Sequence, residues 1–163
     1  MKILGTKNDI DYLQILQITK MNIYLDIDGV LLINDQNPAK HTQEFIAYVL
    51  NHFPDTTYWL TTHCQGDAMT PIEHVRHLFD AKTVDLMKKI KPTEWHLHKT
   101  NALDFSKPFL WFDDDCFDSE REVLIRHGVL DNWIEVDLRK DENQLRRFIS
   151  SFPIPVTKSG ITI

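Results

Sequence analysis

Short apolar runs, each of a length that suits one buried strand, alternate along this chain with segments of helical periodicity. The strand-like runs lie at residues 22–26, 57–61, 109–112 and 133–137, with a weaker candidate at 94–98. The helical patterns lie at residues 42–53, 70–78, 80–91, 119–127 and 141–149. Strands that alternate with helices predict an α/β domain with a mainly parallel sheet. We expect a three-layer α/β/α sandwich around a Rossmann-like central sheet.

These patterns define one folded domain within the 163 residues of the chain. The predicted domain covers residues 21–152. Residues 1–20 precede the first strong strand pattern, and we interpret them as an N-terminal extension that is either helical or extended. Residues 153–163 follow the last predicted helix and contain Pro153 and Pro155, which favours an irregular C-terminal tail.

Composition disfavours several classes of protein. No apolar stretch approaches the length that crosses a bilayer, and Asp9 and Asp11 interrupt the N-terminal region before a signal-type stretch can develop. We therefore expect a cytoplasmic protein without a membrane partner. Cys64 and Cys116 are too few for a disulfide scaffold. A net charge of −6 argues weakly against a duplex nucleic-acid binder, since carboxylates in a metal site also contribute to it.

The sequence Asp26-Ile27-Asp28-Gly29 follows directly on the first apolar run. A buried strand therefore delivers Asp26 at its tip, and Asp28 would point to the same side if the strand continued. Gly29 lets the chain turn and lets a ligand approach the backbone closely. Two carboxylates this close repel each other unless a cation lies between them, and a hard divalent ion is the natural partner.

A second acidic group, Asp113-Asp114-Asp115, follows the apolar run at 109–112. Ligands of an open parallel sheet bind at the carboxyl ends of its strands, so this group should meet Asp26 at one edge. Mg²⁺ usually binds one or two protein carboxylates together with waters and phosphate oxygens, and Asp26 and Asp113 meet that requirement. Asp114 is a further candidate ligand, whereas Asp115 suits a helix start.

Four motifs in this order resemble the haloacid dehalogenase-like (HAD) hydrolase superfamily over roughly residues 22–150. The first is IYLDIDGVLL, with Asp26 and Asp28, and the last is FLWFDDD. Between them lie the threonine that ends YWLT and a lysine upstream of the last motif. The DxDGV match is the most specific, while the threonine and the lysine are persuasive only through their order. The resemblance implies a HAD-like fold and a Mg²⁺-dependent phosphatase.

The resemblance also implies a role for each matching residue. Asp26 would be the nucleophile that forms an aspartyl-phosphate, and Asp28 would be the general acid and then the base that activates water. Thr61 and Lys99 would hold the phosphate oxygens as charge develops, and Gly29 would line the substrate site. Family members also use the main-chain carbonyl at the position of Asp28 as a metal ligand. The expected ligands of Mg²⁺ are Asp26, Asp28, Asp113 and Asp114.

The threonine and the lysine each have an alternative. We prefer Thr61, at the end of its strand pattern, and keep Thr62 as a second substrate-binding candidate. Lys99 lies just before a short helical stretch, which suits a side chain that faces the site. Lys107 immediately precedes a predicted strand and should emerge at the opposite edge of the sheet, and Lys91 is a more distant third choice.

The spacing of the motifs leaves no room for a large cap domain. About thirty residues separate Asp28 from Thr61, and a similar number separate Thr62 from Lys99. The resemblance is therefore to capless or minimal-cap phosphatases, which often act on large substrates or use a partner subunit as a lid. The expected partner is a phosphorylated substrate, either a small molecule or the end of a macromolecule. A nucleotidase, a nucleic-acid 3′-phosphatase and a protein phosphatase all stay open, as does the oligomeric state.

Other interpretations are less favoured. The histidines that could form a zinc site do not have the spacing of a tight metal motif, although His63 is placed to touch substrate; they are His63, His74, His77, His96 and His98. In a response-regulator receiver domain the acidic pair precedes the phosphorylated aspartate, whereas here the DxDG strand comes first. A non-catalytic phospho-ligand binding module on the same fold is disfavoured because no member of the catalytic set is missing.

Overall fold

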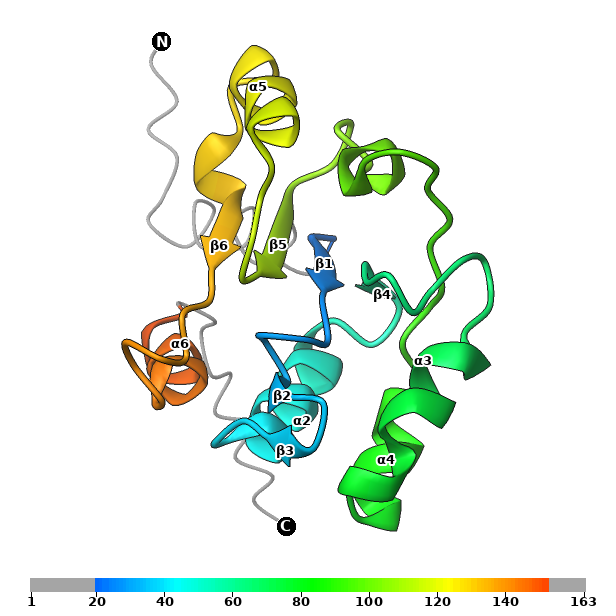
Figure 1. Ribbon diagram of the computed structural model, residues 1–163. Helices are drawn as coiled ribbons and strands as arrows, with labels where there is room; N and C mark the ends of the chain where they lie inside the picture. Colours follow the sequence, from blue (N-terminus) through cyan, green and yellow to red (C-terminus); the bar gives the residue numbers. More distant parts are fainter. Residues whose placement is uncertain (1–19, 153–163) are drawn as a thin grey trace, which may run out of the picture.

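The computed structural model describes residues 20–152, which form an α/β domain around one parallel sheet (Figure 1). The strands in spatial order are β4 (Thr57–Trp59), β1 (Asn22–Leu25), β5 (Phe109–Asp113) and β6 (Trp133–Glu135). The α-helices are α2 (Thr42–His52), α3 (Met69–Val75), α4 (Ala81–Met87), α5 (Asp118–Arg126) and α6 (Gln144–Ser151). The expected α/β class and the parallel sheet are confirmed. The predicted extension, apart from Lys20, and the predicted tail lie outside the described residues.

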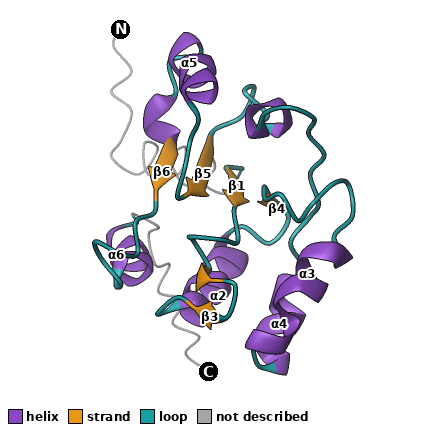
Figure 2. Cartoon of the chain, viewed as in Figure 1, coloured by secondary structure: helices purple, strands orange, loops and turns teal. Residues whose placement is uncertain are grey.

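The strand that leads to Asp26 lies inside the sheet, between β4 and β5. Leu25 pairs in register with Trp59 of β4 and with Phe112 of β5. Because all three strands are parallel, their carboxyl ends meet at one edge of the sheet. The chain segments that follow β1, β4 and β5 therefore begin side by side, and long loops join these short strands to the rest of the domain (Figure 2).

Alternate residues of the strands pack into two separate hydrophobic clusters. Ile23, Leu25 and Phe112 belong to one cluster, which also contains the buried faces of α2 and α4 and Leu145 of α6. Tyr24 and Trp111 belong to the other, together with Leu124 of α5. Since successive side chains of a strand point to opposite faces, the sheet is covered with apolar side chains on both faces.

A small antiparallel hairpin, which the alternating patterns did not predict, follows the Asp26–Gly29 segment. Its strands are β2 (Leu32–Asn34) and β3 (Asn37–Pro38). The turn between Ile27 and Leu32 is tight, because the carbonyl of Ile27 accepts hydrogen bonds from the main-chain N–H groups of Leu31 and Leu32, at 2.8 and 3.0 Å. The chain thus reverses directly beyond the first acidic motif.

The prediction of a strand at residues 94–98 is wrong. The only strand-like pairing nearby is an isolated bridge between Lys91 and Tyr58, and Pro92 follows it. Proline has no N–H to donate to a ladder, so the pairing cannot continue past it. The segment instead runs as an irregular loop up to the 3₁₀ helix η2 (Lys99–Ala102).

Two helices begin one residue earlier than their sequence patterns predict. Helix α3 begins at Met69, one residue before Thr70, and the side chain of Asp67 accepts hydrogen bonds from the main-chain N–H groups of both residues. Helix α5 begins at Asp118 rather than after Ser119. At α3 a short polar side chain just upstream takes the free N–H groups, so the sequence alone does not fix which residue caps that helix.

Two further findings bear on the composition. Cys64 and Cys116 are both buried and free, as expected for structural thiols. Among the described residues, no helix has both the length and the apolar character that a membrane span requires. The two remaining 3₁₀ helices are η1 (Arg76–Leu78) and η3 (Leu130–Asn132).

Candidate active site

Asp26 lies at the carboxyl end of β1, where the sheet fixes its backbone. Its N–H donates to the carbonyl oxygen of Phe112 at 3.0 Å, which continues the ladder with β5 by one residue. Its side-chain Oδ1 accepts a hydrogen bond from the N–H of Ile27 at 2.8 Å. Since Asp26 is only 6% exposed, this carboxylate is held in one orientation at the floor of the sheet edge.

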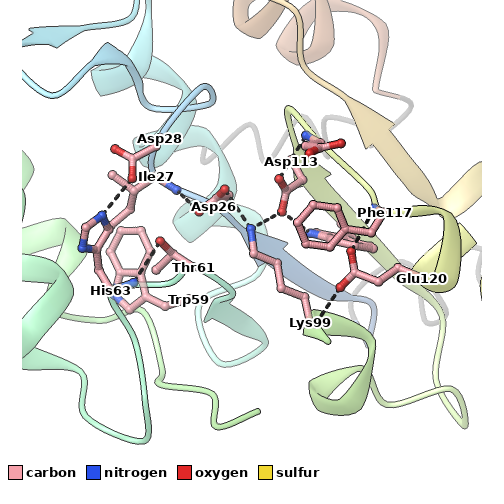
Figure 3. Close-up of polar contacts among 12 residues, drawn as sticks. Asp26, Ile27, Asp28, Trp59, Thr61, His63, Lys99, Asp113, Phe117 and Glu120 are labelled. Atoms are coloured by element: carbon pink, nitrogen blue, oxygen red, sulfur yellow. Dashed lines mark hydrogen bonds and ion pairs between the residues drawn. The ribbon is translucent and has the colours of Figure 1, made fainter. Parts of the chain in front are cut away.

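Lys99 connects Asp26 to Asp113 through its ammonium group (Figure 3). Its Nζ lies 2.9 Å from Oδ2 of Asp26 and 2.6 Å from Oδ2 of Asp113. The indole N–H of Trp111 donates to the same Oδ2 of Asp113 at 2.9 Å. Residues that are far apart in the sequence thus form one buried charge cluster at the carboxyl ends of β1 and β5.

Glu120 positions the lysine, and the sequence analysis missed this residue. Its Oε1 accepts a hydrogen bond from the main-chain N–H of Lys99 at 2.7 Å, and its Oε2 accepts one from that of Phe117 at 3.1 Å. Glu120 is 3% exposed, so both bonds are shielded from water. The only available signal was a carboxylate among the first residues of a helix, which is usually read as a local cap.

Burial and mutual repulsion set the protonation of this cluster. Burial, and then the charge of Asp26, raise the pKa of Asp113 to about 8, although Lys99 acts in the opposite direction. The same two causes, in the same order, raise the pKa of Asp114. Burial lowers the pKa of Lys99, but attraction to Asp26 and Asp113 outweighs it, so this pKa is raised. One ammonium faces three carboxylates, and a further cation would favour their ionised forms.

Asp114 occupies the space where a side chain at position 29 would lie. A Cβ atom built on Gly29 would be 2.2 Å from Cγ of Asp114 and 2.3 Å from its Oδ2. Gly29 also has a φ of +76°, in the left-handed region. The first acidic motif can therefore pack against the second only because residue 29 has no side chain.

We expect Gly29→Ala to destabilise the protein by about 1–3 kcal/mol, because the strained φ and the displaced Asp114 both contribute. Urea denaturation measures this loss. Gly128→Ala is the matched control, since Gly128 has a φ of +68° but nothing within 4 Å of a built Cβ. The control should show only the backbone cost. Equal losses in the two variants would mean that the contact with Asp114 contributes nothing.

The residues at this edge fit a hard divalent cation. One oxygen each from Asp26, Asp113 and Asp114 lie within 4.8 Å of one another. All three donors are carboxylate oxygens, which Mg²⁺ prefers, and Asp114 is exposed, so waters and a substrate can complete the coordination. The side chain of Asp28 lies outside this set, and the ligand expected at this position, its main-chain carbonyl, stays a prediction.

Asp28 belongs to a second cluster, with two histidines. Its Oδ2 lies 2.8 Å from Nε2 of His63, and its Oδ1 lies 3.8 Å from Nε2 of His74. Figure 3 shows its carboxylate turned toward the His63 ring. The strand ends at Leu25, three residues earlier, so strict alternation does not extend to Asp28. His77 and His96 are exposed, and they lie outside this cluster.

The two threonine candidates occupy different environments. Thr61 is fully buried, and its hydroxyl accepts a long hydrogen bond, 3.4 Å, from the N–H of His63. Thr62 is exposed and lines a cavity of about 130 Å³ together with Asp26 and Lys99. A phosphate in this cavity would thus meet Thr62 directly, so the geometry favours the second choice for substrate contact.

The alternative lysines lie away from the cluster. Lys107 pairs with Asp104 at 3.2 Å, in the turn before β5 and therefore at the opposite end of that strand from Asp113. Lys91 donates to the carbonyl oxygen of Asp55, just before β4. Of the three candidates, Lys99 alone contacts Asp26 and Asp113.

Comparisons with protein-family models, with curated proteins and with solved structures find no match to this chain. What the cluster does chemically is therefore inferred from its own residues. A carboxylate held rigidly at a strand end, an ammonium beside it and oxygen donors for a divalent cation are groups that can support phosphoryl transfer.

Proposed function

We propose that this protein is a Mg²⁺-dependent phosphatase that forms a covalent phosphoryl intermediate on Asp26. The observation that carries the proposal is the contact of Lys99 with both Asp26 and Asp113, beside Asp114, at the carboxyl edge of adjacent parallel strands. This is the place where open α/β sheets bind their ligands. The groups also occur in the chain order that resembles the HAD superfamily.

The packing of the domain supports the fold that this proposal requires. The two hydrophobic clusters use alternate residues of the same strands, and different helices cover them. We therefore infer the three-layer α/β/α arrangement of a HAD-like domain. A cytoplasmic location stays a prediction from the sequence.

The chemistry follows from the surroundings of Asp26. Its Oδ2 attacks the phosphorus atom while Oδ1 stays hydrogen-bonded to the N–H of Ile27. A carboxylate and a phosphate repel each other, and Lys99 offsets this repulsion because its ammonium lies beside the attacking oxygen. Mg²⁺ bound by the carboxylates would supply further neutralisation of the phosphate oxygens. Thr62 lines the same cavity and can donate to an equatorial oxygen.

Asp28 is the proton donor to the leaving group in this proposal. In an in-line displacement the leaving oxygen lies on the far side of phosphorus from the nucleophile. The side chain of Asp28 is separate from the group formed by Asp26, Asp113 and Asp114, and the proposal assigns it to that leaving oxygen. The same carboxylate, once it has lost its proton, can take one from the water that attacks the intermediate.

The rim of the cavity favours a substrate with an apolar or aromatic group near its phosphate. Leu97 is 75% exposed and Phe117 is 61% exposed, and both line the cavity that contains Asp26 and Lys99. The ring of Phe117 can stack on a nucleobase, and Leu97 adds an apolar contact. The rim thus supports the nucleotidase and nucleic-acid 3′-phosphatase alternatives. A phospho-ligand binding module would bind the same compounds without hydrolysing them.

Hydrolysis of p-nitrophenyl phosphate tests the proposal. We expect activity in Mg²⁺, loss of activity in EDTA and recovery when Mg²⁺ is restored, because the carboxylates repel both one another and the phosphate without the cation. Beryllium fluoride, which mimics a phosphoryl group on a carboxylate, should inhibit only when Mg²⁺ is present. Full activity in EDTA, or recovery with Zn²⁺ alone, would contradict the proposal.

A further inference from the structure

The side chain of Asp28 is held from outside its own loop. The strand ends at Leu25, and the side chain of Asp28 is 41% exposed, so neither the sheet nor burial fixes its direction. Its Oδ2 makes one side-chain hydrogen bond, to Nε2 of His63 at 2.8 Å. His63 comes from the loop that follows β4, 35 residues further along the chain.

A second histidine holds the ring of His63 in place. The rings of His63 and His74 are stacked, with centroids 3.6 Å apart and planes inclined by 18°. His74 lies on α3, and its Nε2 faces Oδ1 of Asp28 at 3.8 Å. Both of these atoms are shielded from solvent and lack a hydrogen-bond partner among the described residues. Two separate segments thus converge on one carboxylate.

We infer that His63, supported by His74, is a positioning residue that aims the carboxyl group of Asp28 at the leaving oxygen of the substrate. This inference rests on the proposed function. A proton donor is useful only within hydrogen-bond reach of the leaving oxygen, and that oxygen lies beyond phosphorus as seen from Asp26. The hydrogen bond from His63 holds Asp28 apart from the other carboxylates, as a donor to the leaving oxygen requires.

His63 assists a reaction with two stages, transfer of the phosphoryl group to Asp26 and hydrolysis of the intermediate. A bond forms between Oδ2 of Asp26 and phosphorus while the bond between phosphorus and the leaving oxygen breaks. The leaving oxygen takes the proton of Asp28, whose carboxylate keeps the hydrogen bond from the N–H of His63. Asp28 next takes a proton from water as that water attacks phosphorus, and the bond to Asp26 breaks to release phosphate and the free carboxylate.

The stacking of the two imidazole rings argues against a metal ion bound jointly by Asp28, His63 and His74. An imidazole nitrogen offers its lone pair in the plane of the ring, so two nearly parallel rings direct their lone pairs side by side rather than at one ion. One ring would have to turn out of the stack before both could bind. The hydrogen bond between His63 and Asp28 is satisfied without such a movement.

Two aryl-containing substrates with different leaving groups test the inference. The p-nitrophenolate ion leaves without a proton, whereas the alkoxide from benzyl phosphate needs one. In His63→Ala, kcat/KM for benzyl phosphate should fall by a factor on the order of 10², while that for p-nitrophenyl phosphate should change by about threefold or less. His63→Gln, which places an N–H near the position of Nε2, should recover much of the loss.

Variants of the neighbouring histidines complete the design. His74→Ala should lower the benzyl phosphate rate selectively, and His74→Phe, which keeps a stacked ring, should not. His77→Ala, at an exposed histidine three residues further on, should change neither rate. Equal losses on both substrates in His63→Ala would overturn the inference, as would stoichiometric Zn²⁺ binding that His74→Ala removes. A wild type that hydrolyses neither substrate would overturn the proposed function, and the inference with it.

Discussion

We expect the Asp26→Asn variant to lose turnover by a factor on the order of 10⁴ or more, while its fold stays intact. Asparagine keeps the shape of the side chain and an oxygen that can accept the N–H of Ile27, but it is not a nucleophile. It also removes the charge that helps to raise the pKa of Asp113. Lys99 keeps its ion pair with Asp113, so the variant should stay folded, while the loss of the ion pair with Asp26 should lower its urea midpoint.

The intermediate gives a second measurement of the same prediction. Rapid acid quench of the wild type with labelled substrate should trap one phosphoryl group per active site, and Asp26→Asn should trap none. Asp28→Asn should retain some attack and accumulate the intermediate, because the hydrolytic water loses its base. Asp55→Asn, at an exposed residue just before β4, is the matched control and should behave as wild type. Near-normal turnover by Asp26→Asn would exclude a carboxylate nucleophile at this position.

The second large effect is expected from Lys99→Ala. Loss of a charged donor beside the reacting phosphoryl group should reduce kcat/KM by a factor on the order of 10² to 10³. The change also leaves two buried carboxylates, Asp26 and Asp113, without their shared ammonium. Removing one partner of a buried ion pair is costly, and we expect the free energy of unfolding to fall by about 2 kcal/mol. The loss is no larger because protonation of Asp113 relieves part of the repulsion between the two carboxylates.

Lys107→Ala is the control for this variant, because Lys107 pairs with Asp104 at the far end of β5. It should change kcat/KM by less than about twofold, as expected for an exposed ion pair remote from the site. Measuring both variants with p-nitrophenyl phosphate and by urea denaturation separates the loss of rate from the loss of stability. If Lys107→Ala were the inactive variant, the lysine of the third motif would be misassigned.

The sequence predicted the parts of this site that depend on strand direction. The apolar runs before Asp26 and Asp113 are long enough to be buried strands, and parallel pairing then brings their ends together. The same reasoning separated Lys99 from Lys107, since a residue just before a strand emerges at the opposite edge. These inferences use only the order of elements, which the alternating pattern encodes well.

Side-chain direction and partner choice were beyond the sequence. The segment at 94–98 has a strand-like composition, but the pairing with β4 stops at Lys91, before Pro92, so this segment does not join the sheet. The contact between Asp28 and His63 depends on a loop conformation that no periodicity describes. Thr62 was ranked below Thr61 because the end of a three-residue strand cannot be placed to within one residue from composition alone.

One hydrogen bond from Glu120 ties the main chain of Lys99 to helix α5 from outside the peptide that follows η2. Leu103 and Phe105 of this peptide pack in the hydrophobic cluster of Tyr24 and Trp111, whereas the tip of its turn, just before β5, takes no part in the charge cluster. Its residues Ser106, Lys107 and Pro108 are exposed at the far end of the strand. This turn is therefore a suitable point for inserting a tag or a reporter domain without disturbing the reacting groups.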